Sequence, residues 1–326
     1  MSKGSSVLIA AFSITLSCTA VPAPASAQER LWPERPVRLI VSQGAGSAQD
    51  IAARIFAEQL SKRWAQPTVI ENRPGADGIN AINAFVGAHH SHTLLFAASG
   101  TFTAHPTQFV KLPYDPGDLV PLARVSSTII AVSVPAALNV NTLGELVALA
   151  RKESGKLNLA PTPGTTEITF DNFLKETSIS MTKIPYSDMT KALADLSENR
   201  IQVMVSSIAI VQSQVEAGKV KLLAITNFKR AAAVPELPTA IEEGYPSLAL
   251  DGLIGIFGPR NLPAGTAERI AADVQAVAAD PAVGARLSAT GQQLDPGGPA
   301  EFAAAVEAQR ESIVATAKAL GIQPVR

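Results

Sequence analysis

The sequence predicts an α/β protein with two doubly wound domains joined by two crossing strands. Three observations lead to this fold class. Short apolar segments alternate with helical segments, which is typical of parallel sheets with crossover helices. The alternation occurs twice, and long extended pieces at 122–134 and 250–257 separate the two series. The 326 residues are also enough for two hydrophobic cores.

The first series combines three strands with two helices. The strands are expected at 38–41, 67–70 and 93–97, and the helices at about 50–63 and 79–88. In the first helix Ile51 and Ile55 recur at helical spacing, and Asp50 and Arg54 stand four residues apart. These spacings predict a helix with one buried face.

The second series begins at a capping box formed by Thr142 and Glu145. Its helices are expected at 142–152, at 166–176 and before Gly218, and its strands at 157–160, 201–205 and 221–226. A second capping box, Thr239 with Glu242, predicts a short helix that Gly244 ends.

The remainder of the chain is expected to be an entirely helical tail that returns to the first domain. Its helices run from Pro281 towards Gly291 and from 299 to 320. We therefore expect domain 1 to comprise residues 28–127 and 255–326, and domain 2 to comprise residues 128–254. Two crossing strands would form a hinge, and the cleft between the domains is the expected binding site.

The N-terminus has the pattern of a signal peptide. Lys3 precedes an apolar stretch at 7–19, and Ala25-Ser26-Ala27 is an A-x-A site, so cleavage is predicted after Ala27 and the location is predicted to be periplasmic. A retained anchor, or a lipoprotein attached through Cys18, is the alternative. Cys18 is the only cysteine, so the predicted mature chain has no disulfide, thiolate nucleophile or cysteine metal site.

Composition and motifs argue against an enzyme. The net charge of −1 gives no basic surface for nucleic acid, and we expect a monomer without a cofactor. No G-x-S-x-G elbow is present, and His105 is too close to Ser99 to serve as a triad base. The cluster His89-His90-x-His92 lies at a turn and lacks a suitable carboxylate, so it predicts no metal site.

Five loops follow the carboxyl ends of predicted parallel strands, the edge at which open sheets bind ligands. They are rich in backbone amides, small hydroxyls and helix N-termini, which suit a small anion. The residues expected to contact the ligand are Gln43, Gly44, Ala45, Gly46, Ser47, Gly75, Asp77, Ser99, Gly100, Thr101, Pro163, Gly164, Thr165, Thr166, Tyr186, Ser206 and Ser207. The alternative is that the hydroxyls only cap helices.

A dinucleotide-binding fold is the rival interpretation. Gly44 and Gly46 follow a strand and precede a helix, and Glu71 ends the next strand as a ribose-binding acid would. Gln49, however, occupies the position of the third glycine, where close packing is needed.

Several strings resemble one known family. They are Pro33-Glu34-Arg35-Pro36-Val37-Arg38-Leu39-Ile40-Val41, Asp50-Ile51-Ala52-Ala53-Arg54, Glu71-Asn72-Arg73-Pro74-Gly75-Ala76, Leu112-Pro113-Tyr114-Asp115-Pro116, Gly155-Lys156-Leu157-Asn158, Ile184-Pro185-Tyr186, Ala217-Gly218-Lys219-Val220-Lys221-Leu222-Leu223-Ala224 and Val234-Pro235-Glu236-Leu237-Pro238-Thr239. Their order and content resemble the Bug family, the extracytoplasmic receptors of tripartite tricarboxylate transporters. The resemblance spans nearly all of the predicted mature chain.

This resemblance implies a Venus-flytrap fold, as in periplasmic binding proteins, and a small organic carboxylate held by backbone amides and waters. It implies transporter membrane subunits as partners, or a sensor kinase if the protein is a sensing subunit. The chain departs from the family at Ser47 and Ala48, which replace glycines, at Glu167, and at Ser206-Ser207, where an acidic residue is usual. Glu167 is expected either to point to solvent or to face the cleft and disfavour multiply charged acids.

Overall fold

The computed structural model describes Met1 and residues 32–88, 90–186 and 188–324. By its internal contacts the chain separates into Met1–Leu31 and Trp32–Arg326, and the fold below is that of the second unit. The predicted signal peptide and its cleavage site after Ala27 lie, beyond Met1, outside the described residues. Among the described residues no helix is both long and apolar enough to cross a membrane.

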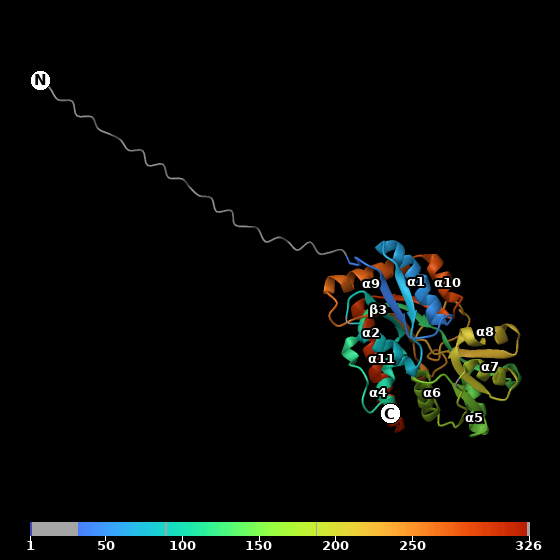
Figure 1. Cartoon of the computed structure of the whole chain (residues 1–326). Helices are drawn as coiled ribbons and strands as arrows, with labels where there is room; N and C mark the ends of the chain where they lie inside the picture. The colour runs from blue at the N-terminus through green and yellow to red at the C-terminus, as the bar shows by residue number, and fades with distance from the viewer. Residues whose placement is uncertain (2–31, 89, 187, 325–326) are drawn as a thin grey trace. The chain divides into compact units, whose positions relative to one another are not determined.

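A six-stranded sheet organises the first lobe, in the order β11-β4-β10-β3-β1-β2. The strands are β1 (Val37–Val41), β2 (Thr68–Asn72), β3 (Thr93–Ala98), β4 (Val120–Thr128), β10 (Gly252–Gly258) and β11 (Gln292–Gly297). The helices of this lobe are α1 (Ala48–Trp64), α2 (Ile79–Val86), α3 (Ser99–Thr103), α4 (His105–Gln108), α9 (Ala264–Ala278), α10 (Pro281–Ser288) and α11 (Pro299–Leu320), with 3₁₀ turns at Ala76–Gly78 and Pro116–Asp118. Figure 1 shows α1, α9 and α10 gathered at one end of the lobe.

A five-stranded sheet organises the second lobe, in the order β7-β6-β8-β5-β9. The strands are β5 (Ile130–Pro135), β6 (Asn158–Pro161), β7 (Thr182–Lys183), β8 (Val203–Ser207) and β9 (Val220–Ile225). The helices are α5 (Leu143–Lys152), α6 (Thr165–Glu176), α7 (Met189–Ser197) and α8 (Ile208–Glu216), with 3₁₀ turns at Ala136–Leu138 and Pro246–Leu248. The predicted α/β fold with two sheets is confirmed.

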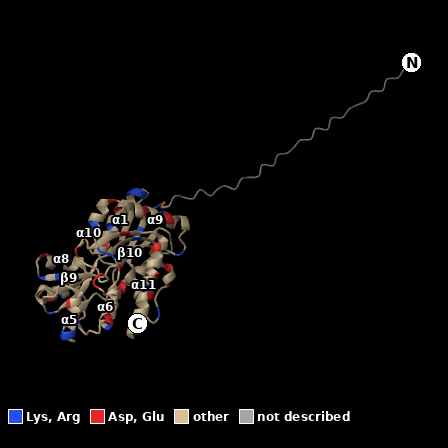
Figure 2. Cartoon of the chain, turned by 180° about the vertical axis from the view of Figure 1, so that it is seen from behind, with Lys and Arg blue, Asp and Glu red and all other residues tan. Residues whose placement is uncertain are grey.

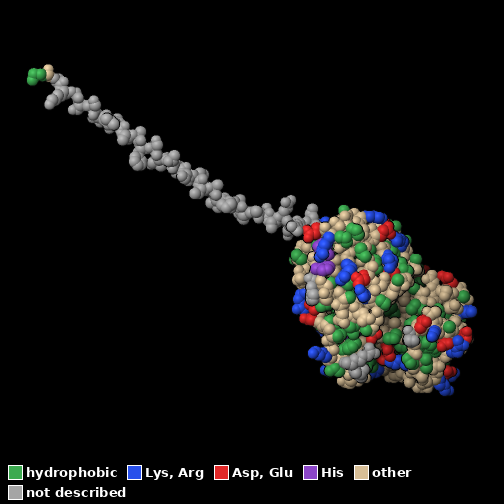
Figure 3. All heavy atoms as spheres, viewed as in Figure 1, with side chains coloured by type: hydrophobic (Ala, Val, Ile, Leu, Met, Phe, Trp, Pro, Cys, Tyr) green, Lys and Arg blue, Asp and Glu red, His purple; other side chains and the backbone are tan. Residues whose placement is uncertain are grey.

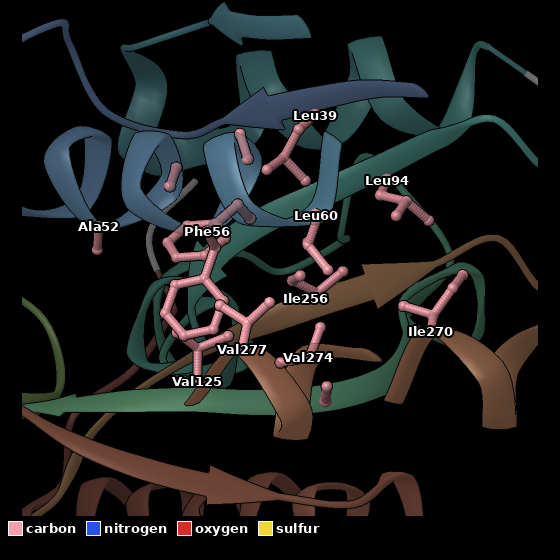
Figure 4. Packing of buried hydrophobic residues seen from close by; sticks show 14 of the residues in the cluster. Leu39, Ala52, Phe56, Leu60, Leu94, Val125, Ile256, Ile270, Val274 and Val277 are labelled. Carbon is pink, nitrogen blue, oxygen red and sulfur yellow. The ribbon is translucent and has the colours of Figure 1, made fainter. Parts of the chain in front are cut away.

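The core of the first lobe lies between its sheet and the helices α1 and α9. Ala52, Phe56 and Leu60 recur every four residues along α1 and are buried, and Figure 4 shows Phe56 pointing towards Val277 and Leu60 towards Ile256. A side chain such as Phe56 contributes about 1.5–3 kcal/mol by its burial. This packing fixes the start of α1, and with it the first predicted ligand loop.

The chain crosses between the sheets twice. It leaves β4 for β5 at Ile129, and it returns between β9 and β10. Asn227 ties the two crossings together, because its side-chain amide donates to the Thr128 carbonyl (3.0 Å) and to the Asp251 carboxylate (3.1 Å). The limits expected for the two domains, residues 28–127 with 255–326 and residues 128–254, remain a prediction.

Three expectations need correction. The sheets are mixed: β1, β2 and β3 are parallel, but β4 pairs antiparallel with β10 and β11, and β5 with β8 and β9, because the chain enters β5 and β10 from the other sheet and not through a helix. The tail is not wholly helical, since β11 joins the edge of β4. The Thr239 capping box forms, but only a turn follows, because Gly244 and Pro246 stop it.

Candidate functional site

Three predicted ligand loops meet at one edge of the first lobe. They follow β1, β2 and β3, which run in parallel, so all three leave the sheet on the same side. A methyl group added at Gly78 would strike the Thr101 side chain and lie 3.8 Å from the Ser42 side chain. The loops 42–49, 74–78 and 99–101 are therefore in close contact.

The first loop is braced by Asp50, which is 1% exposed. Its carboxylate accepts hydrogen bonds from the Gly46 amide (2.9 Å), the Arg54 guanidinium (2.9 Å) and the Asn72 side chain (2.9 Å). Burial alone would raise the pKa of Asp50, but these hydrogen bonds lower the pKa below its ordinary value. The loop is thus held by a buried, ionised carboxylate.

Gln49 fixes the other side of this loop. Its side-chain amide donates to the Ser42 hydroxyl (2.9 Å) and to the Phe96 carbonyl (2.8 Å). A long buried side chain therefore lies where a dinucleotide fold needs a glycine for helix and strand to approach. The rival interpretation loses its structural basis here.

The second loop contains Ala76 and Asp77 in left-handed conformation, with φ of 49° and 53°. Such a conformation costs an alanine about 1–2 kcal/mol, so contacts elsewhere must hold it. His105, fully buried, provides one: its Nε2 lies 3.0 Å from the Asp77 carbonyl, and its Nδ1 lies 2.7 Å from the Tyr114 hydroxyl.

The partners of His105 define its protonation. A carbonyl can only accept, so Nε2 carries the proton and Nδ1 accepts from Tyr114. Burial lowers the pKa of His105, although the contact with the Asp77 carbonyl opposes this, and burial raises the pKa of Tyr114. The neutral pair positions the second loop.

The third loop is anchored from the far end of the chain. Gln309 on α11 accepts from the Ser99 hydroxyl (2.7 Å) and the Thr103 hydroxyl (3.1 Å), and it donates to the Asp251 carbonyl (2.9 Å). Ser99 is fully buried by this contact. No local pattern in the sequence points to Gln309, since 210 residues separate it from Ser99.

The two lobes approach each other where α3 of the first lobe and α6 of the second lobe begin. A methyl group added at Gly100 would lie 2.8 Å from the Thr165 hydroxyl oxygen, so the two helix starts nearly touch. Gly164, with φ of 93°, precedes α6, and no side chain caps this helix. Its first amides therefore keep their hydrogen-bonding capacity.

The remaining residues of the second lobe have different surroundings. Ser207 caps α8 by accepting from the Ala209 amide (3.4 Å), as the capping alternative anticipates, and Ser206 is fully buried. Tyr186 donates to the Asp195 carboxylate (2.6 Å). Burial and, to a smaller extent, this hydrogen bond raise the pKa of Tyr186 to about 12. The structure thus directs the Tyr186 hydroxyl to α7.

Glu167 lies in the first turn of α6 but is paired with a lysine. Its carboxylate is 2.7 Å from the Lys183 ammonium, which also lies 2.8 Å from Asp171. Burial would lower the pKa of Lys183, but its hydrogen bonds with Asp171 and Glu167 raise it. The Glu167 carboxylate is thus directed to Lys183 on β7.

The described residues were expected to hold no metal site, and their possible metal ligands and surface charges are distributed as follows. Among the described residues no group of three His, Cys, Asp or Glu side chains could hold a metal ion. His92 instead packs against Trp32, with ring centroids 5.8 Å apart, and His89 lies outside the described residues. Figure 3 shows acidic and basic side chains interspersed over the face it views.

Residues 52–304 match the family described as tripartite tricarboxylate transporter family receptor (TctC). A UPF0065 protein of Bordetella bronchiseptica is 28% identical over 311 residues, covering 95% of this chain and 92% of the relative.

Two solved structures have the same fold. Rpa4515 of R. palustris with adipate is 26% identical, with a TM-score of 0.76, and the match covers 90% of this chain and 100% of that one. MatC of Rhodopseudomonas palustris with bound malate is 25% identical, with a TM-score of 0.72, covering 87% and 99%. The match to a family of receptors confirms the predicted class of solute receptor over that of an enzyme. The chain belongs to the tripartite tricarboxylate transporter receptor family.

Proposed function

We propose that the protein captures a small organic carboxylate between its two lobes and presents it to the membrane subunits of a tripartite transporter. One observation carries this proposal: the uncapped N-terminus of α6 faces the loops of the first lobe across the contact of Gly100 with Thr165. Free amides and the positive end of the helix dipole favour a carboxylate at this position. The related proteins named above hold adipate and malate, which are both dicarboxylates.

The charges around α6 support an anionic ligand. Glu167 would oppose an anion at the start of this helix, but Lys183 compensates its charge. The ligand therefore meets backbone amides and hydroxyls, including those of Thr165 and Thr166. The predicted ligand residues include no lysine or arginine, so we expect these amides and hydroxyls to bind the carboxylate.

The two crossings between the sheets support closure of the lobes on the ligand. We expect residues 28–127 and 255–326 to move as one body against residues 128–254, with the turning points near Ile129 and Asp251. A ligand that contacts both lobes binds the closed form better and so shifts the population towards it.

The partners and location follow from the same family. We propose that the protein is exported to the periplasm, is cleaved after Ala27 and acts as a monomer. N-terminal sequencing of the exported protein should begin at Gln28, and a mature chain that retains Met1 would contradict the proposal.

A thermal-shift screen tests the ligand class. Dicarboxylates, tricarboxylates, aromatic acids and amino acids are added to the purified protein, and the true class should raise the melting temperature by mass action. Affinities are then measured by calorimetry for two variants. Gly164→Pro removes an amide and cannot adopt φ of 93°, so it should weaken binding about tenfold or more, whereas Thr165→Ser should have little effect. Equal affinities for wild type and a folded Gly164→Pro would refute the site.

A further inference from the structure

A second cavity, of about 660 Å³, adjoins the anchor of the third ligand loop, because Gln309, which accepts from Ser99, is one of its lining residues. It is enclosed by α6, by α11 and by the returning segment 246–253. Figure 2 shows α6 and α11 side by side. Over the described residues, its lining includes none of the residues predicted to contact the carboxylate. Its volume is that of a pocket for a small organic molecule.

Both lobes build the walls of this cavity. Ile313 and Ala317 of α11 pack against Ile168 of α6, and the Lys175 ammonium donates to the Ala319 carbonyl (2.6 Å). These contacts join the two helices beside the cavity. The cavity therefore has a built floor and is not an open surface between two separate parts.

Part of the floor and part of the rim of the cavity are apolar. Leu250, Leu253 and Ile313 are 5%, 4% and 3% exposed, so they present a closed hydrophobic floor. Phe228 is 57% exposed and lies at the rim. An exposed phenylalanine beside a hydrophobic floor offers apolar contact to a ligand and an aromatic face to a cation.

The charges of the cavity are unbalanced. Asp251 accepts from the Asn227 side chain (3.1 Å) and the Phe228 amide (3.3 Å), and Glu176 accepts from the Asn172 side chain (3.3 Å). Among the described residues neither carboxylate forms an ion pair within 4.0 Å.

One basic side chain, Arg124, also lines the cavity. Its guanidinium is already paired with Asp295 (3.1 Å) and Glu301 (2.7 Å). Among the described residues Arg124 forms no ion pair with Asp251 or Glu176, although its positive charge acts on Asp251 from a distance. Burial raises the pKa of Asp251, and the negative charge of Asp295 adds to this rise, while the hydrogen bonds from Asn227 and the Phe228 amide and the charge of Arg124 oppose it.

We propose that this cavity is a second ligand site, which binds an organic cation with an apolar body. The ammonium group lies at Asp251, with Glu176 adding negative charge, and the apolar body rests on Ile313 and Leu253 and against Phe228. The two sites would differ in the charge of their ligands, since this site would select a cation and the other an anion.

Calorimetry with phenethylammonium chloride tests the proposal, with 2-phenylethanol as the uncharged probe of matching shape. We expect saturable binding of phenethylammonium at millimolar concentrations or below, and binding of 2-phenylethanol weaker by about tenfold. Asp251→Asn should weaken phenethylammonium binding by about tenfold, and Glu311→Gln, an exposed position on α11 outside the cavity, should not. Equal binding of the two probes overturns the proposal.

A blocking variant keeps the test independent of Asp251. Ser312 is exposed on α11 and lines the cavity, so Ser312→Phe should fill the cavity and abolish binding without unfolding the protein. Ala315→Phe places the same side chain at an exposed position of α11 outside the cavity, and it should bind the probe as wild type does. Unchanged binding in Ser312→Phe, or an equal loss in Ala315→Phe, refutes the site.

Discussion

The two halves of the proposed carboxylate site are held in different ways. In the first lobe, side chains reach each loop from a helix: Asp50 holds Gly46, His105 holds Asp77, and Gln309 holds Ser99. In the second lobe, the loop before α6 is fixed through the main chain and the Thr162 hydroxyl, which both contact the Val205 carbonyl. The first lobe thus presents a preformed surface, and the second contributes an uncapped helix start that the ligand itself can satisfy.

The largest effect that this comparison predicts is at Asp50. Asp50→Ala removes the acceptor for Gly46, Arg54 and Asn72, and we expect unfolding free energy to fall by about 3 kcal/mol. Glu58→Ala, on the exposed side of the same helix, removes only surface ion pairs and should leave the free energy of unfolding nearly unchanged. Urea denaturation of both variants measures the difference, and equal losses would show that the first loop is not braced in this way.

The contribution of Asp50 also has a defined pH dependence. The folded pKa lies below the ordinary value of 3.8, so the stabilisation is complete above that value and is lost as the pH falls through the folded pKa. The stability difference between wild type and Asp50→Ala should therefore be constant near neutral pH and should shrink below about pH 4. A difference that grows on acidification would contradict the assignment.

The next largest effect concerns the contact between the halves. Gly100→Ala adds a methyl group 2.8 Å from the Thr165 hydroxyl oxygen, and we expect carboxylate affinity to fall about tenfold because the lobes cannot approach as closely. Alanine suits a helix better than glycine, so the melting temperature should not fall.

A second substitution sharpens this test. Thr165→Ala removes the hydroxyl that the new methyl group would meet, which is also a proposed ligand contact, so the double variant Gly100→Ala with Thr165→Ala should lose less affinity than the two single losses added together. Calorimetry on the complete double-mutant cycle gives the interaction between the two positions. Strictly additive losses would show that this contact plays no part in closure.

The contrast between the lobes also explains what sequence alone could predict. Helix α11 was predicted with its observed limits, because Pro299 starts it and Gly321 follows its end. The meeting of the first three loops follows from parallel strands, which is a local pattern. In contrast, β11 contains Asp295, Pro296 and Gly297, which disfavour strands, and only its pairing with β4 makes it one.

The bracing residues could not be found from local patterns. The role of His105 has no local signal in the sequence, because it depends on contacts with Asp77 and Tyr114, 28 and 9 residues away. Tyr114 lies in the string L-P-Y-D-P, which identified the family without indicating what the residue does. Long-range polar contacts of this kind carry no periodicity, so they require the three-dimensional structure.

A smaller effect is expected at Tyr114. Tyr114→Phe removes the hydroxyl that donates to His105 Nδ1 and leaves a buried acceptor unpaired, so we expect a loss of about 1 kcal/mol in unfolding free energy. Carboxylate affinity should fall as well, because His105 holds the left-handed second loop. A variant that loses stability at unchanged affinity would show that the second loop is positioned independently of His105.

The smallest effect is expected at Glu167, where the second lobe differs from the family pattern. Glu167→Gln breaks an exposed ion pair, but Asp171 still holds Lys183, so the stability should change by about 0.5 kcal/mol or less. Because the carboxylate of Glu167 is turned to Lys183, the ratio of affinities for adipate and hexanoate, a dicarboxylate and a monocarboxylate of equal length, should stay the same. Asp171→Asn, one turn further from the start of α6, is the matched control and should behave likewise. If calorimetry showed that Glu167→Gln alone favours adipate by more than about threefold, which corresponds to about 0.6 kcal/mol, Glu167 would act on the ligand directly and the helix start would not be the neutral amide surface described here.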